Sequence, residues 1–255
     1  MPHLSVQAET VTATNVTDAG VTAAGVSAAG VTDAGVTAEK SGESDSAPLA
    51  DEPAFAPVSD SEIVFAGKVW DVRRDTFGYN GSGIVREYLD HPGAVAILAL
   101  DEQDRVLLIK QYRHPVRTRD WELPAGLLDE AGEHPLVGAQ RELAEEADLV
   151  ATDWNVLGEF ATSPGGSNEV IRIYLARGLA VAPEVFERTE EEADIEVRWV
   201  PLDDCVDAVL ARRVQNPSLV IGALAALAAR ARGWSSLGAA DAPWPRHPVN
   251  WDHTV

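Results

Sequence analysis

The chain has 255 residues, of which 41 are Asp or Glu and 20 are Lys or Arg, so its formal net charge is −21. This acidity argues against a nucleic-acid partner, and no run of 18 apolar residues suggests a membrane span. Cys205 is the single cysteine and the N-terminus does not resemble a signal peptide, so we expect no disulfide framework and a reducing, cytoplasmic setting.

Residues 1–57 have the composition of a disordered, acidic, low-complexity tail. A five-residue unit repeats over residues 21–35 as VTAAG, VSAAG and VTDAG, and its side chains are too small to bury enough apolar surface to offset chain entropy. A short β-solenoid is the alternative interpretation. We therefore expect a single globular domain over residues 58–235, followed by a loose C-terminal tail over residues 236–255.

From Ser61 onward, alternating and β-branched runs predict strands, and Asn80-Gly81 predicts a tight turn. The expected strands are Glu62–Asp71, Ser82–Leu89, Ala94–Leu100, Val106–Gln111, Trp121–Ala125, Trp154–Ala161, Val170–Ala176 and Ile195–Val200. The expected helices are 135–147, Leu202–Arg212 and Pro217–Arg232. This order predicts an α+β fold with a mixed β-sheet sandwiched between helices and an N-terminal strand region over residues 58–90.

The helix over residues 135–147 carries an unusual acidic face. Glu142, Glu145 and Glu146 stand at spacings of three and four residues and share one face, where like charges destabilise a helix unless they are neutralised. An ordinary solvated face, with Arg141 paired to Glu145, is one interpretation. The other is a site for a hard divalent cation, because carboxylate oxygens without Cys or His suit Mg²⁺ or Mn²⁺.

The full pattern around this helix favours the metal site. Gly126 precedes Glu133 in a loop, and Arg141-Glu142-Leu-Ala-Glu145-Glu146 follows after seven residues. This resembles the Nudix box, G-x5-E-x7-R-E-U-x-E-E-x-G-U, in which U is a bulky aliphatic residue. The chain departs from it twice. Six residues, not five, separate Gly126 from Glu133, and Asp148 replaces the glycine, although Asp tolerates the left-handed backbone conformation.

The resemblance implies a role for each matching residue. Glu142 and Glu146 would be the main metal ligands, with Glu145 assisting and the carbonyl of Ala125 able to coordinate an ion. Arg141 would orient the carboxylates, and Glu133 would support the loop. The metal would be Mg²⁺, with Mn²⁺ as the alternative.

Three further segments resemble the ADP-ribose pyrophosphatase branch of the same family. They are QYRHPV from Gln111, WELPAG from Trp121 and SPGGSNE from Ser163. The resemblance implies that Arg113 and Arg86 approach substrate phosphates, although a surface ion pair is a common alternative for any arginine. It also implies that the loop with Ser163, Gly165, Gly166 and Glu169 lines the nucleotide site, although Pro-Gly-Gly equally suits a simple turn.

The acidic run from Glu190 to Asp194 is the last candidate. Such a run before a strand is usually a solvated loop. In the family that this chain resembles, a glutamate of this loop reaches over the bound metals and activates water, which implies Glu192 as the general base, with Glu191 second.

Together these features predict a Mg²⁺-dependent hydrolase that splits the pyrophosphate of ADP-ribose, or of a related nucleoside diphosphate sugar, into AMP and ribose 5-phosphate. A UDP-sugar, a GDP-sugar or coenzyme A is the alternative substrate. A ligand sensor that lacks catalysis and a scaffold that binds partners through its acidic tail are the other two interpretations. By the same resemblance we expect a homodimer in which the strands of residues 58–90 form the contact.

Overall fold

The computed structural model describes residues 48–184 and 194–250. Residues 48–52 are exposed and have no regular secondary structure, and the remaining described residues belong to one compact unit, Pro53–Val255. Within the described residues, no helix is both long and apolar enough to cross a membrane.

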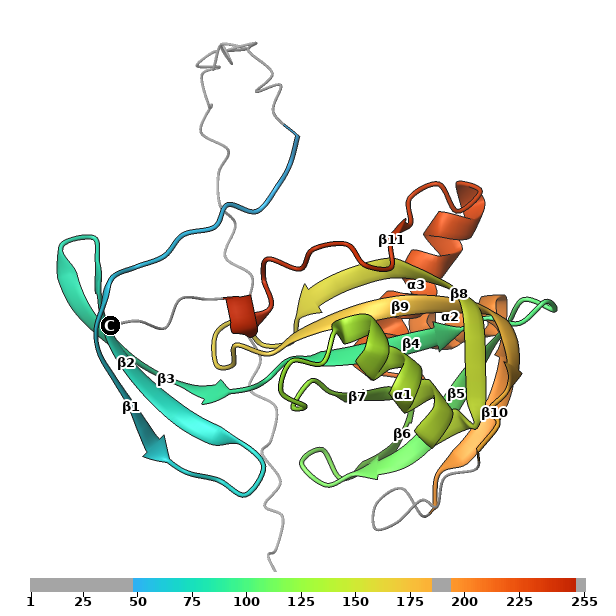
Figure 1. Cartoon of the computed structure of the whole chain (residues 1–255), viewed down its shortest axis with the longest axis horizontal. Coiled ribbons are helices and arrows are strands. Elements are labelled where there is room, and N and C mark those ends of the chain that lie inside the picture. The colour runs from blue at the N-terminus through green and yellow to red at the C-terminus, as the bar shows by residue number, and fades with distance from the viewer. Residues whose placement is uncertain (1–47, 185–193, 251–255) are drawn as a thin grey trace, which may run out of the picture. The chain divides into compact units, whose positions relative to one another are not determined.

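The unit combines three sheets with helices in the order shown in Figure 1. The strands are β1 (Val58–Phe65), β2 (Asp71–Tyr79), β3 (Ser82–Asp90), β4 (Ala94–Ala99), β5 (Arg105–Arg113), β6 (Thr118–Glu122), β7 (Ala125–Leu127), β8 (Leu149–Ala161), β9 (Val170–Val181), β10 (Glu196–Pro201) and β11 (Gly238–Ala239). The helices are α1 (Pro135–Ala147), α2 (Leu202–Leu210), α3 (Pro217–Ala231) and the short 3₁₀-helix η2 (Pro248–Asn250).

Strand β4 lies inside the largest described sheet, which has the order β11-β8-β9-β4-β7. It runs parallel to β9 and antiparallel to β7, and all its residues are buried. Val95 and Ile97 join the core that packs against α1, whereas Ala96 and Leu98 join the core that packs against α2 and α3. The continuous apolar sequence of β4 is therefore explained by a strand that is covered on both faces.

The helices flank this sheet, with α1 on one face and α2 and α3 on the other (Figure 1). A second sheet of order β10-β5-β6 shares both cores, through Leu107 and Ile109 on the α1 side and Leu108 on the side of α2 and α3. The predicted α+β fold, with mixed strands between helices, is confirmed.

The N-terminal strands differ from the prediction. A single strand over Glu62–Asp71 was expected, but β1 ends at Phe65 and a new strand, β2, begins at Asp71. The sequence of β2, DVRRDTFGY, lacks an apolar alternation, and the strand pairs with β1 on one side and β3 on the other. The predicted turn is confirmed, because Asn80 and Gly81 both have positive φ angles, as a two-residue hairpin turn of type I′ requires.

The described part of the C-terminal segment is packed rather than loose, so the expected tail over residues 236–255 is wrong for residues 238–250. Strand β11 pairs with β8, and Trp244 is only 5% exposed. The buried guanidinium of Arg172 donates to the carbonyls of Ala242 and Pro243 and lies 4.7 Å from the centre of the Trp244 ring. A cation from β9, about seventy residues earlier in the chain, therefore holds this segment.

Candidate active site

Helix α1 matches its predicted bounds because both of its ends are well specified. The side chain of His134 accepts the amide of Leu136 at the N-cap, and Pro135 occupies the first turn. The helix ends at Asp148, which has φ 53° and ψ 34°, the left-handed conformation expected where the glycine is replaced. The apolar side of the helix, with Ala139 and Leu143, packs on the sheet and directs the neighbouring carboxylates toward the sheet edge.

Two carboxylates of α1 meet strand β7. Glu146 is 4% exposed and its Oε2 accepts the amide of Ala125 at 2.8 Å. Glu142 is 9% exposed and packs so closely on Gly126 that a Cβ there would lie 1.9 Å from its carboxyl carbon. The close approach of the Glu142 side chain, not a positive φ angle, therefore explains why glycine suits position 126. The side chain of Glu145, by contrast, is 34% exposed and turns toward Arg141.

Arg141 joins the acidic residues into one network. Its guanidinium contacts Glu133 at 3.1 Å and Glu145 at 3.1 Å, and its Nη1 donates to Glu142. Hydrogen bonding to Glu133, ahead of the electrostatic effect of Glu142, raises the pKa of Arg141 further above its ordinary value. Gly138 leaves room for Glu133, because a Cβ at Gly138 would come within 2.8 Å of that carboxylate. The inserted loop residue therefore leaves Glu133 within reach of Arg141.

Arg113 lies on the same side of β5 as helix α1. Ile109 belongs to the core beneath α1, and Arg113 follows it by four residues, which returns to the same face of a strand. Its guanidinium forms two hydrogen bonds with Glu122, of 2.9 Å and 2.7 Å, and the Arg113 side chain remains 41% exposed. The structure thus brings Arg113 to the face that carries the α1 carboxylates. On this face Arg113 is already paired with the buried acid Glu122.

Arg86 lies elsewhere, on an exposed part of β3 in the N-terminal sheet. Its Nη1 donates to the carbonyl of Val85 at 2.8 Å. It therefore belongs to a different sheet from Arg113.

The loop between β8 and β9 is fixed by hydrogen bonds to the end of β3. The amide of Gly166 donates to the carbonyl of Ser163, and the carbonyl of Gly166 accepts the amide of Leu89 at 3.0 Å. A Cβ on Gly165 or on Gly166 would meet no atom within 4 Å, and neither glycine has a positive φ. The fold itself therefore does not require glycine at these two positions.

Glu169, at the end of this loop, contacts two neighbours. Its Oε2 accepts the hydroxyl of Thr162 at 2.6 Å, and its Oε1 lies 3.3 Å from Nε2 of His91. Burial lowers the pKa of His91, although the charges of Glu169 and Asp90 oppose that shift. No local pattern singles out His91, because its burial depends on stacking with Trp70 and on contacts with this distant loop.

The expected general base lies outside the described residues. Glu192 and Glu191 both fall in the segment 185–193.

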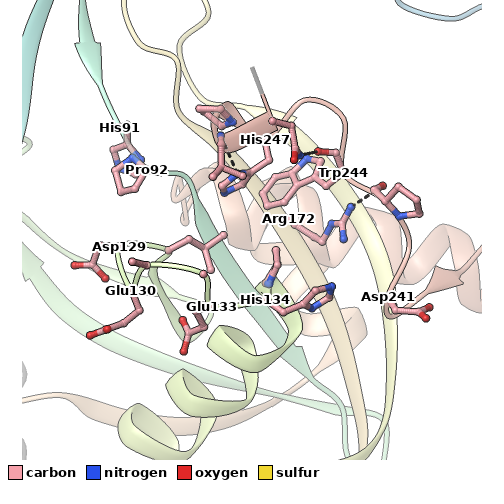
Figure 2. Close-up of a pocket in the computed structure, with 18 of the residues that line it drawn as sticks. His91, Pro92, Asp129, Glu130, Glu133, His134, Arg172, Asp241, Trp244 and His247 are labelled. Carbon is pink, nitrogen blue, oxygen red and sulfur yellow. Dashed lines mark hydrogen bonds between the residues drawn. The ribbon is translucent and has the colours of Figure 1, made fainter. Parts of the chain in front are cut away.

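A cavity of about 760 Å³ adjoins the loop that leads into α1. Figure 2 shows His91 and Pro92 on one side of it, Asp129, Glu130 and Glu133 on another, and Trp244 with Arg172 opposite. Among the described residues to which the sequence resemblance gives a role in metal binding, substrate binding or catalysis, only Glu133 lines this cavity. Glu142 and Glu146 are not among the residues that line it.

Glu122 is a residue that the sequence analysis missed. It is 2% exposed, and it stands in the segment WELPAG, between Arg113 and strand β7 in the sequence. Its position as the single charged residue of the segment WELPAG was the available signal.

Comparison with known proteins identifies the family. A family model, the NUDIX domain, matches residues 90–219. An ADP-ribose pyrophosphatase from Mycobacterium tuberculosis is 41% identical over 190 residues, which cover 74% of this chain and 91% of the relative. An ADP-ribose pyrophosphatase from Bacillus subtilis is 40% identical over 156 residues, covering 61% of this chain and 83% of the relative.

A solved structure supports the fold. The crystal structure of an ADP compounds hydrolase superposes with a TM-score of 0.60 at 19% identity, covering 72% of this chain and 99% of that one. The family model, the two relatives and the α1–β7 geometry agree, and the chain belongs to the Nudix family as a Nudix hydrolase.

Proposed function

We propose that this chain hydrolyses the pyrophosphate bond of ADP-ribose, or of a related nucleoside diphosphate sugar, in a Mg²⁺-dependent reaction. With ADP-ribose the products would be AMP and ribose 5-phosphate. The observation that carries the proposal is the meeting of two buried carboxylates, Glu142 and Glu146, with strand β7 on the side of the fold that also presents Arg113. The similarity to the Mycobacterium tuberculosis ADP-ribose pyrophosphatase supports this substrate class.

The donor atoms suit a hard divalent cation. Glu142 and Glu146 offer carboxylate oxygens beside strand β7, where Gly126 has no side chain and so leaves room for the Glu142 carboxylate. Within residues 48–184 and 194–250, no three acidic, His or Cys side chains gather as a complete site. We assign the carbonyl of Ala125 as a further ligand, with Glu145 assisting. When bound there, Mg²⁺, or Mn²⁺ as the alternative, would neutralise the diphosphate and lower the pKa of a water molecule.

The remaining roles belong to other residues of the chain. Arg113 would donate N–H groups to a phosphate oxygen, which is the electrostatic stabilisation that phosphoryl transfer needs, and Arg86 would add a second donor. Arg141 holds Glu142 and Glu145 in place. We assign the general base to Glu192, whose carboxylate would take the proton of the attacking water, with Glu191 as the second candidate. Ser163, Gly165, Gly166 and Glu169 would line the nucleotide side of the site.

We also propose a homodimer formed through the N-terminal sheet. Strands β1, β2 and β3 form a three-stranded sheet whose exposed apolar side chains include Ile63, Val64, Phe65 and Val85. A small sheet that leaves such side chains exposed is stabilised by a further layer, which a second copy of the chain would provide.

The substrate is tested by incubating the protein with Mg²⁺ and a panel of diphosphates, with products separated by chromatography. The panel holds ADP-ribose, a UDP-sugar, a GDP-sugar and coenzyme A. We expect ADP-ribose to be split with the highest kcat/KM, giving AMP. A higher kcat/KM for the UDP-sugar, the GDP-sugar or coenzyme A would identify that compound as the preferred substrate instead. Binding without turnover would indicate a ligand sensor.

The base is tested with Glu192→Gln and Glu191→Gln at saturating Mg²⁺. Glutamine keeps the shape of the side chain but cannot accept the proton, so Glu192→Gln should lower kcat by roughly 10²- to 10⁴-fold with KM largely kept. A loss confined to Glu191→Gln would move the base by one residue. If both variants kept full activity, the base would lie elsewhere, and Glu169 would be the next candidate.

A further inference from the structure

Glu122 is a carboxylate that the fold buries almost completely. It is 2% exposed at the end of β6, and in the β5–β6 ladder it stands opposite Ile109, on the side of the strands that faces the core under α1. Removing an isolated carboxylate from water is strongly unfavourable unless it is paired and hydrogen-bonded. Such a burial needs a partner that compensates for it.

Arg113 provides that compensation in a two-point geometry. Its Nε donates to Oε1 of Glu122 at 2.9 Å and its Nη2 donates to Oε2 at 2.7 Å, while Nε2 of Gln111 lies 3.4 Å from the same Oε2. Two parallel hydrogen bonds fix both the direction and the plane of a guanidinium, which one contact does not. The direction of the partly exposed Arg113 side chain is therefore set by Glu122.

Glu122 is also joined closely to strand β7, which the α1 carboxylates contact. The next residue, Leu123, is fully buried, and the carbonyl of Pro124 accepts the amide of Ile97 at 2.8 Å. Ala125 then donates its amide to Glu146. Two residues, Leu123 held by burial and Pro124 held by a hydrogen bond, separate Glu122, which holds Arg113, from Ala125, where Glu146 meets β7.

We propose that Glu122 is a positioning residue, which holds the guanidinium of Arg113 at a fixed place relative to Glu142 and Glu146 so that it meets a phosphate of the bound diphosphate. The inference rests on the proposed function. The pair is electrically neutral as a whole, so what Glu122 supplies is the orientation of the arginine N–H groups, not additional charge.

A double-mutant cycle tests this role with steady-state kinetics on ADP-ribose. Glu122→Gln keeps the volume but can accept from only one side of the guanidinium fork, and Arg113→Lys removes the fork. We expect each to lower kcat/KM by about 10- to 100-fold, the value of one hydrogen bond to a charged group, mainly through KM. The double variant should be no worse than Arg113→Lys alone, because the two residues act as one unit.

Two further variants separate positioning from charge and from general stability. Glu122→Asp keeps the carboxylate but withdraws it by one methylene, so it should raise KM as Glu122→Gln does. Glu159→Gln changes another acid that accepts two hydrogen bonds from a buried arginine, Arg172, at 2.9 Å and 2.6 Å, and should leave both kcat and KM unchanged. Melting curves confirm that each variant is folded.

The outcomes are distinct. Folded Glu122 variants with the wild-type KM, or effects of Glu122→Gln and Arg113→Lys that simply multiply, would overturn the proposal while leaving the function intact. A wild-type KM in Glu122→Asp alone would assign Glu122 to charge balance and also overturn it. Loss of the folded state in both Glu122 variants would assign the residue to stability alone. If the wild-type protein splits no diphosphate of the panel, the proposed function fails, and the positioning role fails with it.

Discussion

The backbone amide of Ala125 donates a hydrogen bond of 2.8 Å to Oε2 of Glu146, which joins β7 to α1 across 21 residues of sequence. The adjacent Glu145 has a different environment, because its side chain is 34% exposed and contacts Arg141 at 3.1 Å. Two consecutive glutamates of one motif are therefore unequal, one fixed against the sheet edge and the other near the surface.

This inequality predicts unequal losses of activity. Glu146→Gln should lower kcat/KM by at least ~10²-fold, comparable to removing one strong electrostatic contact in the transition state, and should weaken Mg²⁺ binding. Glu145→Gln should cost much less, because its carboxylate mainly contacts Arg141. Turnover measured against Mg²⁺ concentration checks both variants, and EDTA should abolish activity in the wild type. Near-normal turnover of Glu146→Gln with EDTA present would show that the metal site is misassigned.

Gly126 offers a steric test of the same site. Gly126→Ala would place a Cβ 1.9 Å from the carboxyl carbon of Glu142, so either the glutamate or β7 must move. Such overpacking typically destabilises a protein by about 1–3 kcal/mol, and we expect a lower melting temperature together with a higher Mg²⁺ requirement. Gly158→Ala is the matched control, because a Cβ at Gly158 meets no atom within 4 Å. Equal behaviour of the two variants would contradict the close approach of Glu142.

The fold could be predicted from the sequence where local signals agree. Helix α1 combines helical periodicity, Pro135 in its first turn and Asp148 at its end, so its bounds were predicted correctly. Strand β2 was missed because its sequence is polar and its strand conformation comes from pairing with β1 and β3. The packing of residues 238–250 was missed for a related reason, since Arg172 and Trp244 are far apart in sequence.

In the candidate site, too, the features set by local sequence could be predicted and those set by long-range contacts could not. Helical spacing alone places Glu142 and Glu146 on one face, and the sequence motif supplied Arg141. The pairing of Arg113 with Glu122 depends on the register of β5 and β6, in which Ile109 stands opposite Glu122, and no local pattern encodes that register.

His91 connects the N-terminal sheet to the loop between β8 and β9, and its environment favours the neutral ring. Its Nδ1 accepts the amide of Gly93 at 2.9 Å, its backbone amide donates to Asn168, and its ring stacks on Trp70. Burial lowers its pKa below the ordinary value, against the opposing charges of Glu169 and Asp90.

This lowered pKa predicts that the folding stability falls as the pH is lowered. Because the folded-state pKa of His91 is lowered, the unfolded chain binds more protons as the pH falls through about 6.5, so folding stability is lost below that pH. The melting temperature should drop less between pH 7.5 and pH 5.5 in His91→Asn than in the wild type, since Asn does not titrate. The exposed His114→Asn is the control and should follow the wild type. If the melting temperatures of His91→Asn and the wild type fell equally between pH 7.5 and pH 5.5, His91 would not be the cause of the pH dependence.

The exposed apolar residues of the N-terminal sheet lead to the last prediction. Ile63 is 49% exposed, Phe65 63% and Val69 66%, all within or beside β1, and the carbonyl of Pro57 anchors the start of this strand to Gly78.

We expect light scattering to give twice the chain mass for the 255-residue chain at micromolar concentration. Phe65→Asp should shift this mass toward that of one chain, because it introduces a charge into an apolar contact that a second copy would bury. Val181→Asp is the matched control, since Val181 is 76% exposed on β9, in a different sheet, and its change should leave the mass unaltered. A chain beginning at Pro53 should keep the dimer mass, because the contact lies in β1 to β3 and not in the acidic tail. A wild-type mass of one chain at every concentration would contradict the dimer, and a dimer that survives Phe65→Asp but not the tail deletion would move the contact to residues 1–52.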